Sequence, residues 1–345
     1  MHIYFAPLEG ITTYPYRNLH HKYFGGVEKY FTPFLAPGPE QGMSVKEMRD
    51  VLPENNAGIP VVPQILTNRA GDFLLASKKL SEMGYREINL NLGCPSGTVT
   101  AKKKGSGFLL YPDDLDRFFD EVFSDAAVRN GEFFVSVKTR IGKNEVEEWP
   151  ELMQVYNRYP IHELTVHPRI QKEFYKGTPH LDVFADILKE SNPVVYNGDL
   201  FTVEKVKEFR EKFPTVGTVM IGRGLIRNPA LAEMILQEET EACTDRLENG
   251  VRIFEADGQL QTQGNRNKGD ILPRIREFHD ALFEHYRETM SGDRNLLFRM
   301  KDLWSYMLAE VPDSEKLAKK IRKSQHVPEY LAAVEEVFAR WDANR

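Results

Sequence analysis

The sequence predicts a (β/α)₈ barrel followed by a small helical domain, and three observations support this fold class. Short apolar segments typical of strands recur about eight times within roughly the first 240 residues. Amphipathic helical patterns fill most of the intervals between them. Beyond residue 270 the pattern is helical throughout. An open doubly wound sheet is the alternative, but no G-x-G-x-x-G follows the first apolar segment, which disfavours it.

Each predicted strand is rich in Val, Ile, Leu, Phe or Tyr and stops at Gly, Pro or a polar residue. The strands are Ile3–Leu8, Lys29–Leu35, Val61–Leu66, Glu87–Gly93, Phe134–Arg140, Glu163–Pro168, Pro193–Gly198 and Thr218–Gly224. Helical periodicity predicts helices at Asp72–Met83, Asp113–Val128, Leu181–Lys189, Thr202–Phe213 and Asn228–Glu239. Gly84 suits the end of the first of these helices, and Asn228 with Pro229 suits the start of the last.

The composition changes after Glu239. Residues 241–270 are polar and rich in Gly, Asn and Gln, which predicts a linker or long loop. Four helices are predicted after it, at Ile271–Met290, Arg294–Glu310, Asp313–Lys323 and Val327–Trp341. The predicted organisation is therefore a catalytic barrel at 1–240, a linker at 241–270 and a helical domain at 271–345.

Composition narrows the class of protein. Two cysteines in 345 residues, Cys94 and Cys243, exclude a disulfide scaffold. Residues 1–10 do not read as a signal peptide, and no apolar stretch approaches ~18 residues, so we expect a cytoplasmic protein that does not span a membrane. The net charge of −6 lacks the basic excess of many nucleic-acid binders, although a local basic face can still bind phosphates.

Seven of the eight predicted strands end in polar or glycine-containing clusters. These are Ala6–Gly10, Gln64, Asn89–Pro95, Lys138–Arg140, His167–Arg169, Asn197–Asp199 and Gly222–Gly224. Each cluster alone has an ordinary explanation, such as a solvated lysine, a hydrogen-bonded histidine or a turn. Because the carboxyl ends of barrel strands share one face, their coincidence predicts a binding site there.

The chemistry of these clusters favours flavin mononucleotide (FMN). Gly198 and Gly222 permit a close approach of backbone N–H groups to an anion, and the helix predicted from Asn228 favours a phosphate at its start. Lys138 and Gln64 offer a cation and an amide to a planar ring with carbonyls. No paired cysteines or histidines have metal-ligand spacing, so no metal is predicted.

Cys94 precedes Pro95 and is expected in a loop at the barrel mouth. From the residues alone it is an unreactive loop thiol, a nucleophile or a proton donor. Cys243 lies in the polar segment and has no predicted role.

The run Asn89-Leu90-Asn91-Leu92-Gly93-Cys94-Pro95, followed by Lys102-Lys103-Lys104-Gly105-Ser106-Gly107, resembles the signature of the tRNA-dihydrouridine synthases. The resemblance continues through Ala6–Leu8, Gln64, Lys138, His167–Arg169, Tyr175, Gly177, Asn197–Asp199 and Ile221–Gly224, and so covers most of the chain. Leu8 stands where the family usually has Met, Ser96–Ala101 departs from the commoner pattern, and residues 243–270 match nothing in it.

The resemblance implies an FMN-binding barrel with a helical domain that helps to hold RNA. It implies reduction of the C5–C6 double bond of particular tRNA uridines, with NADPH recharging the flavin, hydride passing from flavin N5 to C6, and Cys94 protonating C5. The implied FMN contacts are Pro7, Leu8, Glu9, Gln64, Lys138, His167, Asn197, Gly198, Asp199, Gly222 and Arg223. The implied substrate contacts are Asn91 and Arg169 at the uracil and Lys102, Lys103 and Lys104 at phosphates.

A second basic cluster falls in the C-terminal domain, at Lys316, Lys319, Lys320, Arg322 and Lys323. It predicts either RNA binding or a solvated helix face. Two other functions remain open. A flavin barrel acting on a free pyrimidine or enone would need neither the helical domain nor the basic spacer. A flavin-free RNA-binding factor would not need Cys94 or Lys138.

Overall fold

The computed structural model describes residues 1–38, 42–189, 193–248 and 271–343. These residues form two compact units. The first contains Met1–Asn18, Val27–Leu200 and Lys207–Gly222, and the second contains Leu19–Gly26, Phe201–Val206 and Arg223–Arg345. The predicted functional division at residues 240 and 271 stays a prediction.

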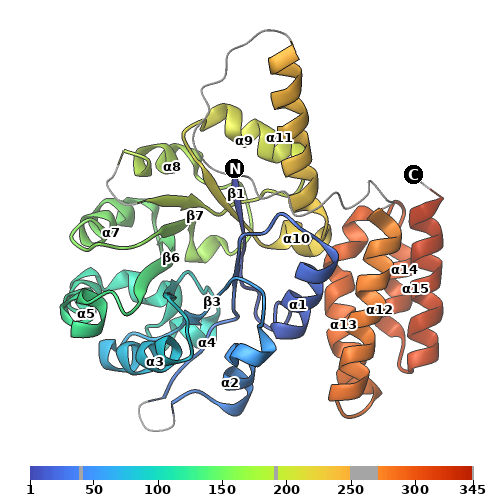
Figure 1. Ribbon diagram of the computed structural model, residues 1–345, viewed down its shortest axis with the longest axis horizontal. Helices are drawn as coiled ribbons and strands as arrows, with labels where there is room; N and C mark the ends of the chain where they lie inside the picture. The colour runs from blue at the N-terminus through green and yellow to red at the C-terminus, as the bar shows by residue number, and fades with distance from the viewer. Residues whose placement is uncertain (39–41, 190–192, 249–270, 344–345) are drawn as a thin grey trace. The chain divides into compact units, whose positions relative to one another are not determined.

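The first unit is built on a parallel barrel, which confirms the predicted fold class (Figure 1). Its strands are β1 (His2–Phe5), β2 (Lys29–Phe31), β3 (Val61–Val62), β4 (Gln64–Ile65), β5 (Glu87–Leu92), β6 (Phe134–Gly142), β7 (Leu164–Ile170), β8 (Val194–Tyr196) and β9 (Thr218–Ile221). Neighbouring strands follow the order β3-β2-β1-β9-β8-β7-β6-β5-β4. All eight predicted strands are present, and β3 and β4 are two halves of one of them.

Pro63 separates these halves because proline has no N–H to donate to a ladder. β3 pairs with β2 on one side, and β4 pairs with β5 on the other. The two ends of the strand order are therefore adjacent in the chain, and the barrel is closed at this point.

Helices follow the strands and cover the barrel. They are α1 (Tyr14–Tyr23), α2 (Val45–Val51), α3 (Ala70–Glu82), α4 (Gly97–Thr100), α5 (Pro112–Ser124), α6 (Ala126–Arg129), α7 (Trp149–Tyr156), α8 (Leu181–Ile187) and α9 (Val203–Lys212). The apolar face predicted for α5 is buried, with Leu115, Phe118, Phe119 and Val122 all under 5% exposed. Gly84 adopts φ +100° just after α3, as expected of a glycine that ends a helix.

The second unit is helical. Its helices are α10 (Arg223–Arg227), α11 (Leu231–Glu248), α12 (Ile271–Thr289), α13 (Asp293–Met307), α14 (Glu315–Lys323) and α15 (Val327–Asp342). In its core the indole of Trp304 donates to the hydroxyl of Tyr330 (2.9 Å), which also lies 2.7 Å from Nε2 of His279. Within the described residues, no helix has both the length and the apolar character needed to cross a membrane.

The start predicted at Asn228 is wrong. A short helix, α10, comes first, and the Asn228 side chain accepts a hydrogen bond from the Ala230 backbone (3.1 Å) in the turn before α11. α11 then continues to Glu248, into the predicted linker, because Glu, Ala and Leu favour a helix even without an apolar period. The rest of that segment, 249–270, lies outside the described residues.

Candidate active site

A buried amide network joins β4 and β5. Gln64 Nε2 donates to Asn89 Oδ1 (2.8 Å), and Asn91 Nδ2 donates to Gln64 Oε1 (2.6 Å). Asn89 Nδ2 in turn donates to Ser136 Oγ on β6 (2.9 Å). The register that places Gln64 beside Asn89 makes this network possible. It fixes the orientation of each amide at the barrel mouth.

The loop after β5 is held from both sides. Oδ1 of Asn91 accepts from the backbone N–H groups of Gly93 (3.1 Å) and Cys94 (2.6 Å). The carbonyl of Cys94 accepts from the backbone and hydroxyl of Ser106 (3.1 and 2.9 Å). Gly105 has φ +56°, and a Cβ there would lie 2.7 Å from that carbonyl. Asn91 and Gly105 thus position Cys94.

Cys94 is a half-buried free thiol. Burial raises its pKa, while a hydrogen bond from the Ser96 backbone and the cations of Arg140 and Lys138 oppose the rise. The thiol therefore holds its proton at neutral pH, which suits a proton donor better than a thiolate nucleophile.

Lys138 lies on β6 in register with Asn91. Burial lowers its pKa to about 7, with repulsion from Arg140 adding to this and Cys94 opposing it. Within the part of the chain that the structure describes, its ammonium forms no ion pair with a carboxylate. A desolvated cation without an anionic partner is suited to an electron-rich ligand.

Arg140 is a site residue to which the sequence assigned no role. It is 1% exposed, and its guanidinium donates to the carbonyls of Gly93 (2.9 Å), Ile170 (3.0 Å) and Phe174 (2.8 Å). Burial lowers its pKa to about 10. Its spacing in the sequence could have identified Arg140, because a residue two positions after Lys138 on a strand lies on the same face as Lys138. Arg140 ties the Cys94 loop to the loop after β7.

Arg169 and Asp199 form a second buried anchor. Arg169 is fully buried and donates to both carboxylate oxygens of Asp199 (3.1 and 2.6 Å). It also donates to the carbonyls of Lys176 (3.2 Å) and Gly177 (2.6 Å), and its Nη1 lies 3.1 Å from His167 Nε2. The guanidinium nitrogens of Arg169 therefore all donate to groups of the protein itself. That it faces the uracil stays a prediction.

The remaining predicted cofactor residues lie at the ends of β1, β8 and β9. Asn197 donates to the carbonyl of Met220 (2.7 Å). A Cβ on Gly222 would meet side-chain atoms of Ala6 and Leu8 at 3.2 Å, a tight contact that a larger residue would fit only if those side chains shifted. Arg223 begins α10 in the second unit, where its guanidinium lies 5.1 Å from the Phe201 ring.

The basic spacer follows the Cys94 loop. Lys102 and Lys103 are exposed and Lys104 is half-buried. The ammonium of Lys103 lies 4.2 Å from the centre of the Tyr111 ring, which holds this side chain against the protein.

The opposite, amino end of the barrel holds a group of metal-ligand type. Glu87, His162 and Glu163 place one ligand atom each within 4.8 Å of one another. The ammonium of Lys29 already bonds to Glu87 (2.7 Å) and Glu163 (2.6 Å), and Tyr4 donates to Glu163 (2.8 Å). Burial alone would lower the pKa of Lys29, but the two carboxylates raise it above its ordinary value. Lys29 therefore balances one of the two carboxylate charges of this cluster and occupies the space between them.

Comparisons with known proteins agree with the motifs. The family model described as dihydrouridine synthase matches residues 4–303. The chain is 30% identical over 245 residues to a probable tRNA-dihydrouridine synthase of Staphylococcus aureus (strain Mu50), covering 68% of this chain and 71% of that protein. It is 28% identical over 231 residues to tRNA-dihydrouridine synthase B of Pasteurella multocida (strain Pm70), covering 66% and 67%.

Among solved structures, a 2-naphthoyl-CoA reductase complex aligns with a TM-score of 0.51 at 9% identity, over 68% of this chain and 50% of that chain. This likeness concerns the barrel fold alone.

Proposed function

The chain belongs to the dihydrouridine synthase family, and on that premise we propose which of its residues reduce uridine in tRNA. The protein is an oxidoreductase of tRNA processing that converts uridine to dihydrouridine. We assign the proton donor to Cys94, the cofactor to FMN and the reductant to NADPH. The observation that carries this proposal is a half-buried thiol, whose pKa burial raises, on a loop that Asn91 fixes after β5. Because the substrate is tRNA, we also assign the enzyme to the cytoplasm.

The residues at the barrel mouth fit a flavin. The ammonium of Lys138, which pairs with no described carboxylate, and the fixed amide of Gln64 suit the carbonyl-rich end of the ring. Gly222 has no side chain, and its backbone lies close to Ala6 and Leu8 in the segment after β1. The proposed FMN contacts are Pro7, Leu8, Glu9, Gln64, Lys138, His167, Asn197, Gly198, Asp199, Gly222 and Arg223. When bound and reduced, FMN would supply the hydride that adds to C6 of the uracil.

The chain's own residues then supply the proton. The S–H bond of Cys94 breaks as a new C–H bond forms at C5, and the sulfur keeps the electron pair as a thiolate. Arg140 and Lys138 stabilise that thiolate, since both cations favour the charged form of Cys94. Asn91 keeps the loop in place by holding the Gly93 and Cys94 N–H groups. The thiol is restored by a proton from solvent.

The test of this function uses the purified protein loaded with FMN. NADPH and an unmodified tRNA transcript should give a nucleoside heavier by about 2 Da at a uridine, detected by mass spectrometry. Free uridine should react far more slowly, because the basic surfaces contribute only when RNA phosphates are present. Equal turnover of free uridine would favour the small-molecule reductase. A protein that binds no FMN would favour the RNA-binding factor.

Lys138 makes the FMN affinity pH-dependent. Its pKa of about 7 means that the ammonium is already charged below that pH, so its contact with FMN is fully available there. Above pH 7 a proton must be taken up before the contact forms, and the affinity should fall by up to about tenfold per pH unit. Fluorescence titration of FMN between about pH 7 and 9 measures this fall.

Lys138→Met should bind FMN more weakly at pH 7 and show little of this slope. Lys79→Met, which removes an exposed lysine of α3, should keep both the affinity and the slope of the wild type. A slope that persists in Lys138→Met would assign the titration to another group.

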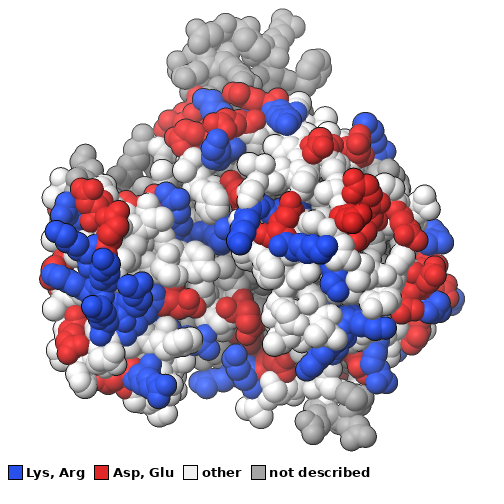
Figure 2. Space-filling view, turned by 180° about the vertical axis from the view of Figure 1, so that it is seen from behind, with Lys and Arg blue, Asp and Glu red and all other residues white. Residues whose placement is uncertain are grey.

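We propose that α14 contributes to RNA binding. Its nine residues include Lys316, Lys319, Lys320, Arg322 and Lys323, all exposed, while Leu317 and Ile321 are buried. Figure 2 shows Lys and Arg side chains gathered over the C-terminal helices. A local cluster of this kind can attract phosphates although the whole chain is acidic.

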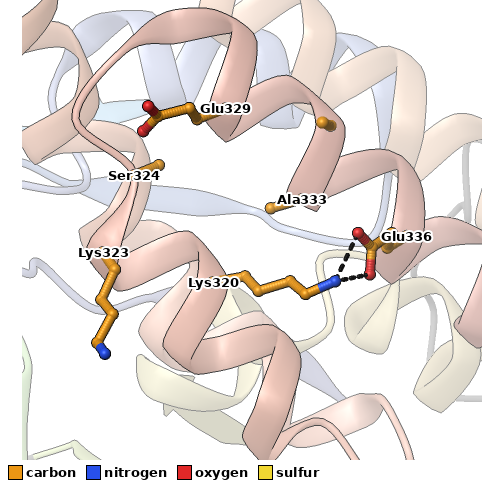
Figure 3. A pocket seen from close by; sticks show the side chains of 7 residues that line it. Lys320, Lys323, Ser324, Glu329, Ala333 and Glu336 are labelled. Carbon is orange, nitrogen blue, oxygen red and sulfur yellow. Dashed lines mark hydrogen bonds and ion pairs between the residues drawn. The ribbon is translucent and has the colours of Figure 1, made fainter.

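The lysines of α14 are not equivalent. A groove of about 350 Å³ separates α14 from α15, and Lys320 crosses it to an ion pair with Glu336 (2.7 Å) (Figure 3). Lys323 points away from this pair in the same view. Lys320 is therefore partly neutralised, whereas Lys319 and Lys323 form no ion pair with described residues and are better placed for phosphate contacts.

Lys319→Ala combined with Lys323→Ala should weaken tRNA binding and reduce the slope of log affinity against log salt by up to about 2. The matched control is Lys79→Ala with Arg129→Ala, which removes the same charge from the surface of the barrel unit. Filter binding across a range of salt concentrations measures both slopes. Equal slopes in the two double variants would assign α14 to solvent.

A further inference from the structure

The loop after β7 exposes two adjacent aromatic side chains at the barrel mouth. Phe174 is 44% exposed and Tyr175 is 51% exposed. The exposed large apolar residues of the described chain are Val45, Leu75, Phe134, Phe174, Tyr175, Phe298 and Leu331. In this set only Phe174 and Tyr175 are neighbours, and they follow the carboxyl end of a barrel strand, where the chemistry lies.

Phe174 is held in this position against its backbone preference. Its φ of 52° and ψ of −95° lie in a region that side chains other than glycine rarely adopt. Its N–H donates to the Gln171 carbonyl (3.0 Å), and its own carbonyl accepts from the buried guanidinium of Arg140 (2.8 Å). Backbone strain of this kind persists where surrounding structure enforces it, most often at functional sites.

The same loop is tied to the proposed proton donor. Gln171 Nε2 donates to the carbonyl of Pro95, the residue after Cys94 (3.1 Å). Arg140 also bridges the two loops, through Gly93 on one side and Phe174 on the other. A side chain carried on this loop therefore keeps a fixed place relative to the site at which uridine would react.

The two aromatic rings have different surroundings. The Tyr175 ring lies 5.6 Å from the Arg140 guanidinium and stacks with His167 at 6.1 Å. The Phe174 ring has no aromatic or cationic neighbour among the described residues. The exposed ring of Phe174 is thus carried on a backbone whose strain the surrounding structure maintains, directly before the exposed ring of Tyr175.

We propose that Phe174 is an apolar wedge that contacts the RNA beside the reacting uridine. The inference rests on the proposed function, because a uridine inside folded RNA must leave its stack to reach a barrel mouth. Its neighbours then lose a stacking partner, and proteins that open base stacks insert apolar side chains at such steps. Phe174 supplies a face for stacking, while the buried Arg140 resists its displacement.

The test is Phe174→Gly, measured on the FMN-loaded protein with tRNA. Glycine removes the ring and tolerates φ 52°, so the melting temperature should stay equal or rise. The affinity for tRNA should fall about tenfold, the usual effect of losing one aromatic stacking contact. The loss should be the same at low and high salt, because the contact is apolar. Phe174→Trp should keep the affinity.

Phe134→Ala is the matched control. Phe134 is 49% exposed but begins β6 at the amino end of the barrel, so its loss should leave tRNA affinity unchanged. If Phe174→Gly fails to fold, Phe174→Ala carries the test, since alanine removes the ring and meets no more backbone strain than Phe174 already bears.

Three outcomes would overturn the proposal that Phe174 is a wedge. The first is a Phe174→Gly variant with wild-type affinity for tRNA. The second is a changed salt dependence of tRNA affinity in that variant, which would make the loop a phosphate site, and the third is an equal loss of tRNA affinity in Phe134→Ala. Failure of the proposed function would appear differently, as a wild-type enzyme that forms no dihydrouridine whatever the affinities.

Discussion

Cys94→Ala is expected to lower the rate of dihydrouridine formation in tRNA by about 10²–10⁴-fold, the usual contribution of a positioned acid. Reduction of the flavin by NADPH needs no proton at C5, so it should proceed at close to the wild-type rate. The two half-reactions can be followed separately, by loss of flavin absorbance under NADPH and by mass spectrometry of the RNA.

Two further variants sharpen this result. Cys94→Ser should also be slow, because a hydroxyl is a far weaker acid than a thiol. Cys243→Ala removes the other cysteine of the chain and should behave as the wild type. A Cys94→Ala enzyme with full uridine reduction would mean that water or another group supplies the proton. One that also fails to reduce flavin would place Cys94 in cofactor binding.

The largest effect on stability is expected from Arg169→Leu. The substitution removes the guanidinium that donates to both Asp199 carboxylate oxygens and to the carbonyls of Lys176 and Gly177. Breaking a buried ion pair by removing one partner costs about 3–5 kcal/mol, and because the Asp199 side chain is 26% exposed we expect a loss at the lower end of this range. The urea midpoint of unfolding should fall accordingly, with little change in the slope of the transition.

A double-mutant cycle tests the cause of this loss. Adding Asp199→Asn to Arg169→Leu should recover part of the stability, because the carboxylate charge that Arg169 balanced is then removed as well. Arg158→Leu breaks an ion pair to Asp116 in which the arginine is more than half exposed, and it should cost under about 1 kcal/mol. Similar costs for Arg158→Leu and Arg169→Leu would contradict the role of burial.

The sequence could predict the barrel because each strand has a local signal. Apolar runs bounded by Gly, Pro or polar residues can be read directly from the sequence. All eight strands that they predict are present in the structure. The start of α11 was misplaced because Asn228-Pro229 carries a local capping signal that the turn after α10 uses differently. Such a choice depends on how the chain packs before and after the turn.

The candidate site, like the fold, could be predicted from the sequence only in part. That Gln64, Lys138 and the Cys94 loop lie near one another could be foreseen, because strand ends of a barrel meet on one face, while their roles stay predictions. The roles of Arg140 and Phe174 were not, because three carbonyls from two loops converge on one guanidinium only in the folded chain. The buried partners of Arg169 were equally invisible, since Asp199 lies thirty positions away.

The cluster around Lys29 closes the amino end of the barrel core. Lys29, Glu87, Glu163 and Tyr4 are linked there by hydrogen bonds of 2.6–2.8 Å, next to the packed interior formed by Tyr4, Phe31 and Met220. Because a packed barrel interior is not a channel, a cofactor bound as we propose would be reached from the carboxyl face alone. If NADPH and the uridine both use that face, we expect them to react in turn, and steady-state kinetics with both substrates varied should show a double-displacement pattern.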